Sequence, residues 1–154
     1  MTERVLWVDD DAALAYPDII DLQLRKYEVT HIREADRAID WFLENRLVVK
    51  SYCRFLVDVQ LPTNGDSRFN PEEMAGELAH GRFAGMKICE LLSQNLASEW
   101  DYIRPRLVLF TRLLNNDRIQ VIQKFASSNN IIFLRRSSGQ SIMKIVDLEG
   151  SQNA

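Results

Sequence analysis

The stretch RFLVDVQLP, residues 54–62, places an aspartate directly after an apolar run and a proline four residues later. The residues from Phe55 to Val57 are continuously apolar and do not alternate with polar ones, which is typical of a strand buried on both faces. Such strands belong to parallel sheets that are covered by helices. The stretch therefore predicts a buried strand that ends on one carboxylate, Asp58.

Four other segments predict further strands of the same sheet. The runs RVLWV at 4–8, RLVLF at 106–110 and IIFL at 131–134 are also continuously apolar, whereas YEVTHI at 27–32 alternates as an edge strand would. Helical spacing appears between the strands, and SIMKIVDLE at 141–149 predicts a short last helix. The spaced apolar residues are Ala35, Ala38, Ile39, Phe42 and Leu43; Ile88, Cys89 and Leu92; and Ile119, Ile122, Phe125 and Ala126. About five strands alternating with five helices predict an α/β fold with helices on both faces of a parallel sheet.

Composition and charge narrow the class of protein. A length of 154 residues fits one domain with one core, and 46% apolar residues with a net charge of -3 indicate a globular chain that does not coat nucleic acid. Cys53 and Cys89 lie far apart and form no cluster with His31 or His80, so neither a disulfide framework nor a zinc site is indicated. The start MTERVLWVDDD is not a signal peptide, and no run reaches the roughly 20 apolar residues of a membrane span. We expect a cytoplasmic protein with neither membrane nor direct nucleic-acid contact.

Polar side chains follow the expected strands at their carboxyl ends. Asp9, Asp10 and Asp11 follow the first strand, Asp58 ends the third, Thr111 follows the fourth, and Arg135 and Arg136 follow the fifth. Ligands bind at this edge of open α/β sheets, and carboxylates held close together attract a hard divalent cation such as Mg²⁺. Each element alone has an ordinary explanation as a turn, a helix cap or a solvated pair. Together they predict a site in which Asp58 is a metal ligand, a nucleophile or both.

In these motifs the chain resembles the receiver domain of two-component response regulators. The VDD at 8–10 resembles the acidic pair of that family, and Asp58 with Leu61 and Pro62 resembles its D-x-x-L-P motif. The resemblance covers nearly the whole chain and implies a flavodoxin-like (βα)5 fold with strand order 2-1-3-4-5.

The resemblance also implies the roles of the site residues. Asp58 is the expected phosphoacceptor, and Mg²⁺ is expected on Asp10, Asp58 and the backbone carbonyl of Gln60, with Asp9 reaching it through water. Thr111 matches the hydroxyl residue that binds the phosphoryl group, and Phe133 matches the aromatic switch position, although plain core packing explains Phe133 equally well.

The implied partners are a histidine kinase or phosphotransfer protein and a downstream protein. No enzymatic activity is expected beyond self-phosphorylation and autodephosphorylation.

Four features depart from the family pattern. Arg136 and Ser137 replace the family's lysine and proline, and arginine binds phosphate with a different reach and fork geometry. Arg112 stands where the family has a small residue, and it either obstructs the pocket or compensates for the lost lysine. Pro17 predicts that the first helix begins near Tyr16, with 11–15 as a loop.

The fourth departure is an insertion at 63–84, after the strand that carries Asp58. Asn64 and Gly65 predict a turn, Asn70 and Pro71 fit a helix cap, and EEMAGELAH predicts a short helix. Four roles for this insertion stay open. It covers the phosphorylation site, presents a surface to a partner, forms a contact in a homodimer, or is a surface loop without a function of its own.

We expect a single receiver-like domain at 1–149 with a tail at 150–154. No output domain follows it here, so either the signal leaves by protein contact or an output domain has been removed. Two alternatives to a phosphoacceptor remain. Arg112, Arg136 and Ser137 favour a pseudo-receiver that binds protein without phosphorylation. A flavodoxin-like phosphate enzyme would need a general acid or base near Asp58, and the sequence offers none.

Overall fold

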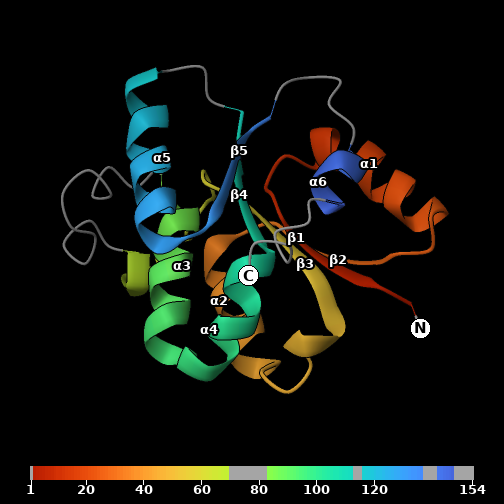
Figure 1. Cartoon of the computed structure of the whole chain (residues 1–154), viewed down its shortest axis with the longest axis horizontal. Helices are drawn as coiled ribbons and strands as arrows, with labels where there is room; N and C mark the ends of the chain where they lie inside the picture. The colour runs from red at the N-terminus through yellow and green to blue at the C-terminus, as the bar shows by residue number, and fades with distance from the viewer. Residues whose placement is uncertain (1, 70–82, 113–115, 137–141, 148–154) are drawn as a thin grey trace.

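The computed structural model describes residues 2–69, 83–112, 116–136 and 142–147. These residues form a five-stranded parallel sheet with strand order β2-β1-β3-β4-β5, shown in Figure 1. The strands are β1 (Arg4–Val8), β2 (Glu28–Ile32), β3 (Tyr52–Asp58), β4 (Leu107–Thr111) and β5 (Ile132–Arg135). The expected flavodoxin-like fold and its strand order are confirmed, and the alternating segment forms an edge strand.

Helices cover both faces of the sheet. Figure 1 shows α1 and α6 on one side and α3 and α5 on the other. The α-helices in the described residues are α1 (Ala12–Leu24), α2 (Ala35–Glu44), α3 (Ala84–Asn95), α4 (Ala97–Ile103), α5 (Asn116–Asn129) and α6 (Ile142–Val146). Short 3-10 turns occur at η1 (Val49–Ser51), η2 (Ser67–Phe69) and η5 (Arg104–Arg106).

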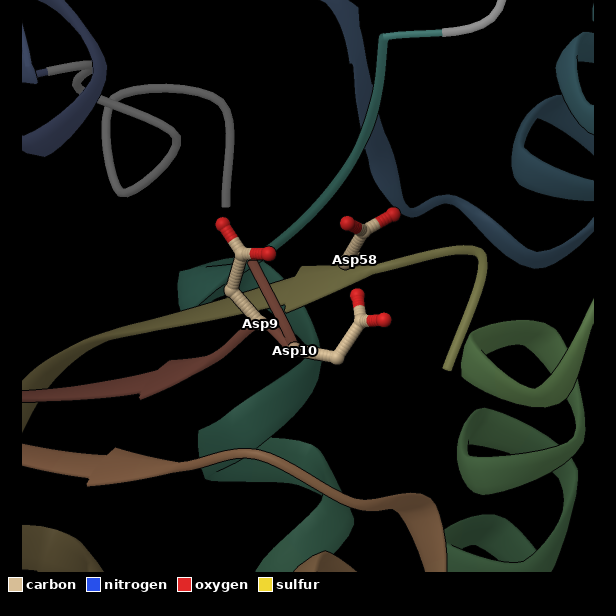
Figure 2. A group of neighbouring side chains, drawn as sticks. All are labelled: Asp9, Asp10 and Asp58. Carbon is tan, nitrogen blue, oxygen red and sulfur yellow. The ribbon is translucent and has the colours of Figure 1, made fainter. Parts of the chain in front are cut away.

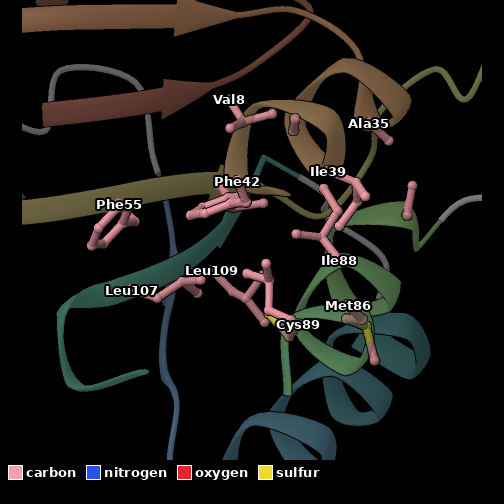
Figure 3. Packing of buried hydrophobic residues seen from close by; sticks show 14 of the residues in the cluster. Val8, Ala35, Ile39, Phe42, Phe55, Met86, Ile88, Cys89, Leu107 and Leu109 are labelled. Atoms are coloured by element: carbon pink, nitrogen blue, oxygen red, sulfur yellow. The ribbon is translucent and has the colours of Figure 1, made fainter. Parts of the chain in front are cut away.

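The core is divided by the sheet into two clusters. In β1, Leu6 and Val8 pack with α2 and α3, while Val5 and Trp7 pack with α1 and α6 on the opposite face. Figure 3 shows part of the first cluster, where Phe42 of α2 and Cys89 of α3 meet the sheet. Burial on both faces explains why β1, β3 and β4 contain continuous apolar runs.

The first helix begins earlier than Pro17 predicts. The α1 helix starts at Ala12, because the Asp11 side chain caps it by accepting a hydrogen bond from Leu14 N at 3.1 Å. Pro17 lies inside the helix, where its nitrogen has no hydrogen to donate to Ala13. The prediction of a loop at 11–15 was therefore wrong, since capping by Asp11 outweighs the unfavourable proline.

The described part of the connection between β3 and β4 contains a helix, α4, that the sequence analysis did not predict. After α3, the chain forms α4, whose last residue, Ile103, is fully buried. The last helix, α6, covers 142–146 of the predicted 141–149, and residues 148 and 149 lie outside the described part.

The first part of the insertion packs against α2. Asn64 and Gly65 form the predicted turn, both with positive φ angles of 53° and 72°. Arg68 then bonds to Asp40 of α2 at 2.8 Å and to Asp66 at 2.7 Å. The predicted helix at 72–80 and its cap at Asn70 and Pro71 lie outside the described residues, as does the tail.

No helix in the described ranges has both the length and the apolar character that a membrane crossing requires.

Candidate functional site

Three carboxylates meet where β1 and β3 end. Asp9 and Asp10 follow β1, and Asp58 is the last residue of β3, which pairs with β1 in parallel. One oxygen from each of the three lies within 4.8 Å of the others, and Figure 2 shows the side chains at the ends of the two strands. The parallel pairing thus brings together residues that are about 50 positions apart in sequence.

Asp9 is the fully buried member of this acidic cluster. Its Oδ1 accepts a hydrogen bond from Asp11 N at 3.0 Å, and its Oδ2 accepts from Trp7 Nε1 at 3.3 Å and from Arg112 Nη2 at 2.9 Å. His31 Nε2 lies 2.9 Å from the Asp9 carbonyl oxygen. These contacts hold the carboxylate in one orientation.

Asp10 is the exposed member. Partial burial raises the pKa of Asp10, and the charges of Asp9 and Asp11 act in the same direction. Asp11 itself points to the helix, since its carboxylate caps α1. Asp10 therefore presents its carboxylate to solvent, beside two neighbouring negative charges.

Asp58 is buried, with only 6% of its surface exposed. Its Oδ1 accepts a hydrogen bond from Gln60 N at 3.0 Å, and its Oδ2 lies 3.5 Å from Arg112 Nη1. Burial first, and then the charge of Asp9, hold the pKa of Asp58 well above its ordinary range. The negative form of Asp58 is thus costly unless positive charge is close by.

The cluster fits a hard divalent cation. All three donors are carboxylate oxygens, which are the ligands that Mg²⁺ and Ca²⁺ prefer, and they converge on one small space. Two of the three are buried, so a cation there would offset charges that water does not solvate. The residues present therefore match the Mg²⁺ that the resemblance in sequence implies.

An open pocket of about 530 Å³ lies in front of these acids. Its volume leaves room for a phosphoryl group between the β1, β3 and β4 ends. The lining residues are Asp10, Asp11, Leu14, Asp58, Gln60, Leu61 and Arg112.

The two arginines named from the sequence have different partners. Arg112 contacts the carboxylates of Asp9 and Asp58. Arg136 instead forms an ion pair with Asp18 of α1, and its guanidinium carbon lies 5.6 Å from the centre of the Trp7 ring. The arginine in the place of the family's lysine is thus held by a helix, while Arg112 enters the acidic cluster.

Three further predicted site residues are placed by their strands and loops. Thr111 is fully buried at the end of β4, and its carbonyl oxygen accepts a hydrogen bond from Arg136 N at 2.8 Å. Phe133 is half-buried in β5 and packs against the first core cluster. Gln60 lines the pocket directly after Asp58.

Sequence reasoning missed two residues of the site's surroundings, Leu14 and Asp18. Leu14 lines the pocket and Asp18 binds Arg136. The two residues are four positions apart on α1, so they lie on one face of the helix. A prediction that the first helix begins after Asp11 would have placed both residues on α1. The sequence signal for that start is Asp11 followed by alanines, which is typical of a helix N-cap.

Comparison with known proteins links this fold to one class. No family model matches the sequence, and no curated protein is significantly similar to it. Solved structures match along nearly the whole chain. A response regulator receiver domain protein from Methanospirillum hungatei shares 16% identity, with a TM-score of 0.62 and coverage of 100% of both chains.

Two other neighbours were solved with ligands or a modification. The response regulator TrrA from Thermotoga maritima, in complex with Mg²⁺–BeF, is 15% identical with a TM-score of 0.59, covering 94% of this chain and 95% of its own. A Burkholderia pseudomallei response regulator with a phosphorylated aspartic acid, calcium ion and citrate is 16% identical with a TM-score of 0.59, covering 98% and 70%. The protein therefore has the fold of response regulator receiver domains, and the resemblance in sequence is confirmed at the level of the fold.

Proposed function

We propose that this chain is a phosphoacceptor signalling domain of a two-component phosphorelay, in which Asp58 accepts the phosphoryl group. The observation that carries the proposal is the position of Asp58, a buried carboxylate that ends a central strand, joins two other acids and lines an open pocket. The domain would extend over 1–149, with 63–84 as an insertion.

The chemistry is a transfer between a phosphohistidine and Asp58. A carboxylate oxygen of Asp58 attacks the phosphorus, the bond from phosphorus to the histidine nitrogen breaks, and the imidazole takes up a proton. Asp9, Asp10 and Asp58, with the backbone carbonyl of Gln60, would hold Mg²⁺. When bound, this ion supplies positive charge that offsets the carboxylates and the phosphoryl oxygens.

Other residues would bind the phosphoryl group or change conformation when Asp58 is phosphorylated. Thr111, at the end of β4, is our candidate for a hydrogen bond to a phosphoryl oxygen, and Phe133 is our candidate for the aromatic switch in β5. Arg136 would serve as the phosphoryl cation only after leaving Asp18.

The comparisons support this function at low sequence identity. One neighbour was solved with Mg²⁺–BeF and another with a phosphorylated aspartic acid. Both cover most of this chain with the same fold.

Protein partners fit the exposed apolar surface of α1, which starts at the pocket with Leu14 and extends to the far end of the helix. Leu14, Ile20 and Leu24 of α1 expose between 49% and 78% of their surface, and Leu14 also lines the pocket. An apolar helix next to the acceptor suits a histidine kinase or phosphotransfer protein. We propose that the signal then passes to a downstream protein or through a homodimer, in the cytoplasm, without membrane or direct nucleic-acid contact and without enzymatic turnover of other substrates.

The second candidate function is a pseudo-receiver that binds protein without phosphorylation. The specific observation in its favour is that both arginines are paired with acids, Arg136 with Asp18 and Arg112 with Asp9 and Asp58. In this state the Arg112 guanidinium, which lines the open pocket, is engaged by carboxylates where a phosphoryl group would need it, and the Arg136 guanidinium is held by α1.

Intact-mass spectrometry separates the two functions. The protein is incubated with acetyl phosphate, with and without Mg²⁺, beside the variants Asp58→Asn and Asp40→Asn. We expect one added phosphoryl group on the wild type only when Mg²⁺ is present, and none on Asp58→Asn, which lacks the nucleophilic oxygen.

Asp40→Asn is the matched control, because Asp40 is an exposed carboxylate on α2 that contacts Arg68 rather than the acidic cluster. It should gain mass as the wild type does. A wild type that stays unmodified with Mg²⁺ present would favour the pseudo-receiver.

A further inference from the structure

We propose that Arg112 is the built-in counter-ion of the acidic cluster and competes with the divalent cation for Asp9 and Asp58. The competition itself needs only the metal site, whereas its consequence, that phosphorylation depends on a higher Mg²⁺ concentration, rests on the proposed function.

The Arg112 guanidinium bridges two carboxylates from different strands. Its Nη2 lies 2.9 Å from Asp9 Oδ2, and its Nη1 lies 3.5 Å from Asp58 Oδ2. The planar fork of arginine presents two nitrogens at once, so one side chain contacts both acids, and its single positive charge offsets one of their two negative charges. The guanidinium carbon also lies 5.4 Å from the centre of the Phe110 ring, which supports the cation in this position.

All four carboxylate oxygens of Asp9 and Asp58 already have a polar contact. Asp9 Oδ1 is used by Asp11 N, and Asp9 Oδ2 is used by Trp7 and Arg112. Asp58 Oδ1 is used by Gln60 N, which leaves Oδ2 as the oxygen nearest to Arg112. A cation that binds these acids must displace the guanidinium or share oxygens with a like charge, and both options weaken its binding.

The Arg112 side chain has space to move, whereas the Arg136 side chain does not. The Arg112 side chain is 26% exposed and borders the pocket of about 530 Å³, so it can leave the acids without unfolding its surroundings. The Arg136 side chain is only 9% exposed and is paired with Asp18. Exchange of cations at the cluster therefore involves Arg112.

Calorimetric titration with Mg²⁺, in the absence of any phosphodonor, tests the competition. The variants are Arg112→Ala and Arg112→Gln, which remove the charge, and Arg112→Lys, which keeps it. We expect the neutral variants to bind Mg²⁺ about tenfold more tightly than the wild type, or about 1.4 kcal/mol at 25 °C. Arg112→Lys should stay within about threefold of the wild type, because a point charge remains near the acids.

Thermal unfolding supplies a second test. If Arg112 had only a structural role, its replacement would not change how much Mg²⁺ raises the unfolding midpoint. Without Mg²⁺ the neutral variants should unfold at a lower temperature, and saturating Mg²⁺ should raise their midpoint by more than it raises that of the wild type. Arg25→Ala is the matched control, because Arg25 lies at the far end of α1, where it pairs with Asp21. It should bind Mg²⁺ as the wild type does.

The outcomes separate this inference from the proposed function. Neutral variants that bind Mg²⁺ no more tightly than the wild type overturn the competition, even if acetyl phosphate modifies Asp58. Tighter binding supports it, even if the wild type accepts no phosphoryl group, a result that would refute the proposed function alone.

Discussion

Gly85 sets how closely α3 approaches the strand that carries Asp58. Its backbone N donates a hydrogen bond to the Val59 carbonyl oxygen at 3.0 Å. A Cβ atom at Gly85 would lie 2.3 Å from the Asp58 carbonyl oxygen and 2.9 Å from Val59 Cα. Both atoms belong to the backbone, so no side chain can rotate to make room. The glycine therefore lets α3 contact the main chain at Asp58 and Val59 directly.

Gly85→Ala should destabilise the protein and disturb the site together. We expect the free energy of unfolding to fall by about 2 kcal/mol or more, within or above the range for overpacked cores, and phosphorylation of Asp58 to slow. Urea unfolding and intact mass after acetyl phosphate measure the two effects.

Gly65→Ala is the matched control for that substitution. A Cβ at Gly65 meets nothing within 4 Å, but its φ of +72° strains any other residue by about 1–2 kcal/mol. Gly65→Ala should lose stability without slower phosphorylation. Equal effects of both variants on phosphorylation would contradict the role given to Gly85.

At the scale of elements, the strands could be predicted from sequence better than the helices. The apolar runs fall within two residues of β1 and β3–β5. In β1, β3 and β4, burial on both faces leaves a continuous apolar run as a local signal. The helix α4, with the sequence ASEWDYI, was missed because its seven residues carry less than two turns of pattern. The start of α1 was misplaced because Pro17 was given more weight than the cap at Asp11.

Arg68 links the start of the insertion to α2 through an ion pair with Asp40. The substitution Arg68→Ala should remove this link. The side chain pairs with Asp40 and Asp66 and is 29% exposed, so we expect a loss below about 1 kcal/mol in the free energy of unfolding. Arg37→Ala, which breaks the more exposed pair with Glu34, should cost still less.

The effect of Arg68→Ala should also depend on pH. The hydrogen bond from Arg68 lowers the pKa of Asp66. A lowered pKa in the folded state stabilises the protein above the ordinary Asp pKa, and this contribution is lost as the pH falls through the folded-state value. The difference between wild type and variant in urea unfolding should therefore shrink from neutral pH to about pH 2.5. A difference that grows in acid would refute this account.

At the scale of the whole molecule, the sequence predicted which residues lie at the carboxyl edge of the sheet. It did not predict which of these residues form ion pairs with one another. Asp9, Asp10 and Asp58 come together because the parallel sheet aligns the ends of β1 and β3. The pairing of Arg112 with two acids and of Arg136 with Asp18 depends on side-chain conformations and on where α1 begins, which no local pattern encodes. The roles of these residues in phosphorylation stay predictions until tested.

Cys89 offers a probe of global unfolding. It is 1% exposed between α3 and the sheet, and its Sγ contacts the Gly85 carbonyl oxygen at 3.4 Å. Burial raises the pKa of the Cys89 thiol far above its usual range, so the reactive thiolate is suppressed in the folded state. In the variant Cys53→Ser, we expect a thiol reagent at mild alkaline pH to modify Cys89 at least about a thousandfold more slowly than in the unfolded chain.

The rate of this modification should rise with urea in parallel with the unfolding equilibrium. Modification that is fast and independent of urea would mean that α3 opens locally, without unfolding of the sheet.

The hydrogen bond from Trp7 to Asp9 gives the acidic cluster an optical reporter. The indole is fully buried, donates to Asp9 Oδ2, meets the Phe110 ring edge-on, and lies near the Arg136 guanidinium. Trp41 and Trp100 pack against the other core cluster, on the opposite face of the sheet. Replacing those two with phenylalanine would leave one tryptophan, and we expect its emission to follow the charge state of the site without an added dye.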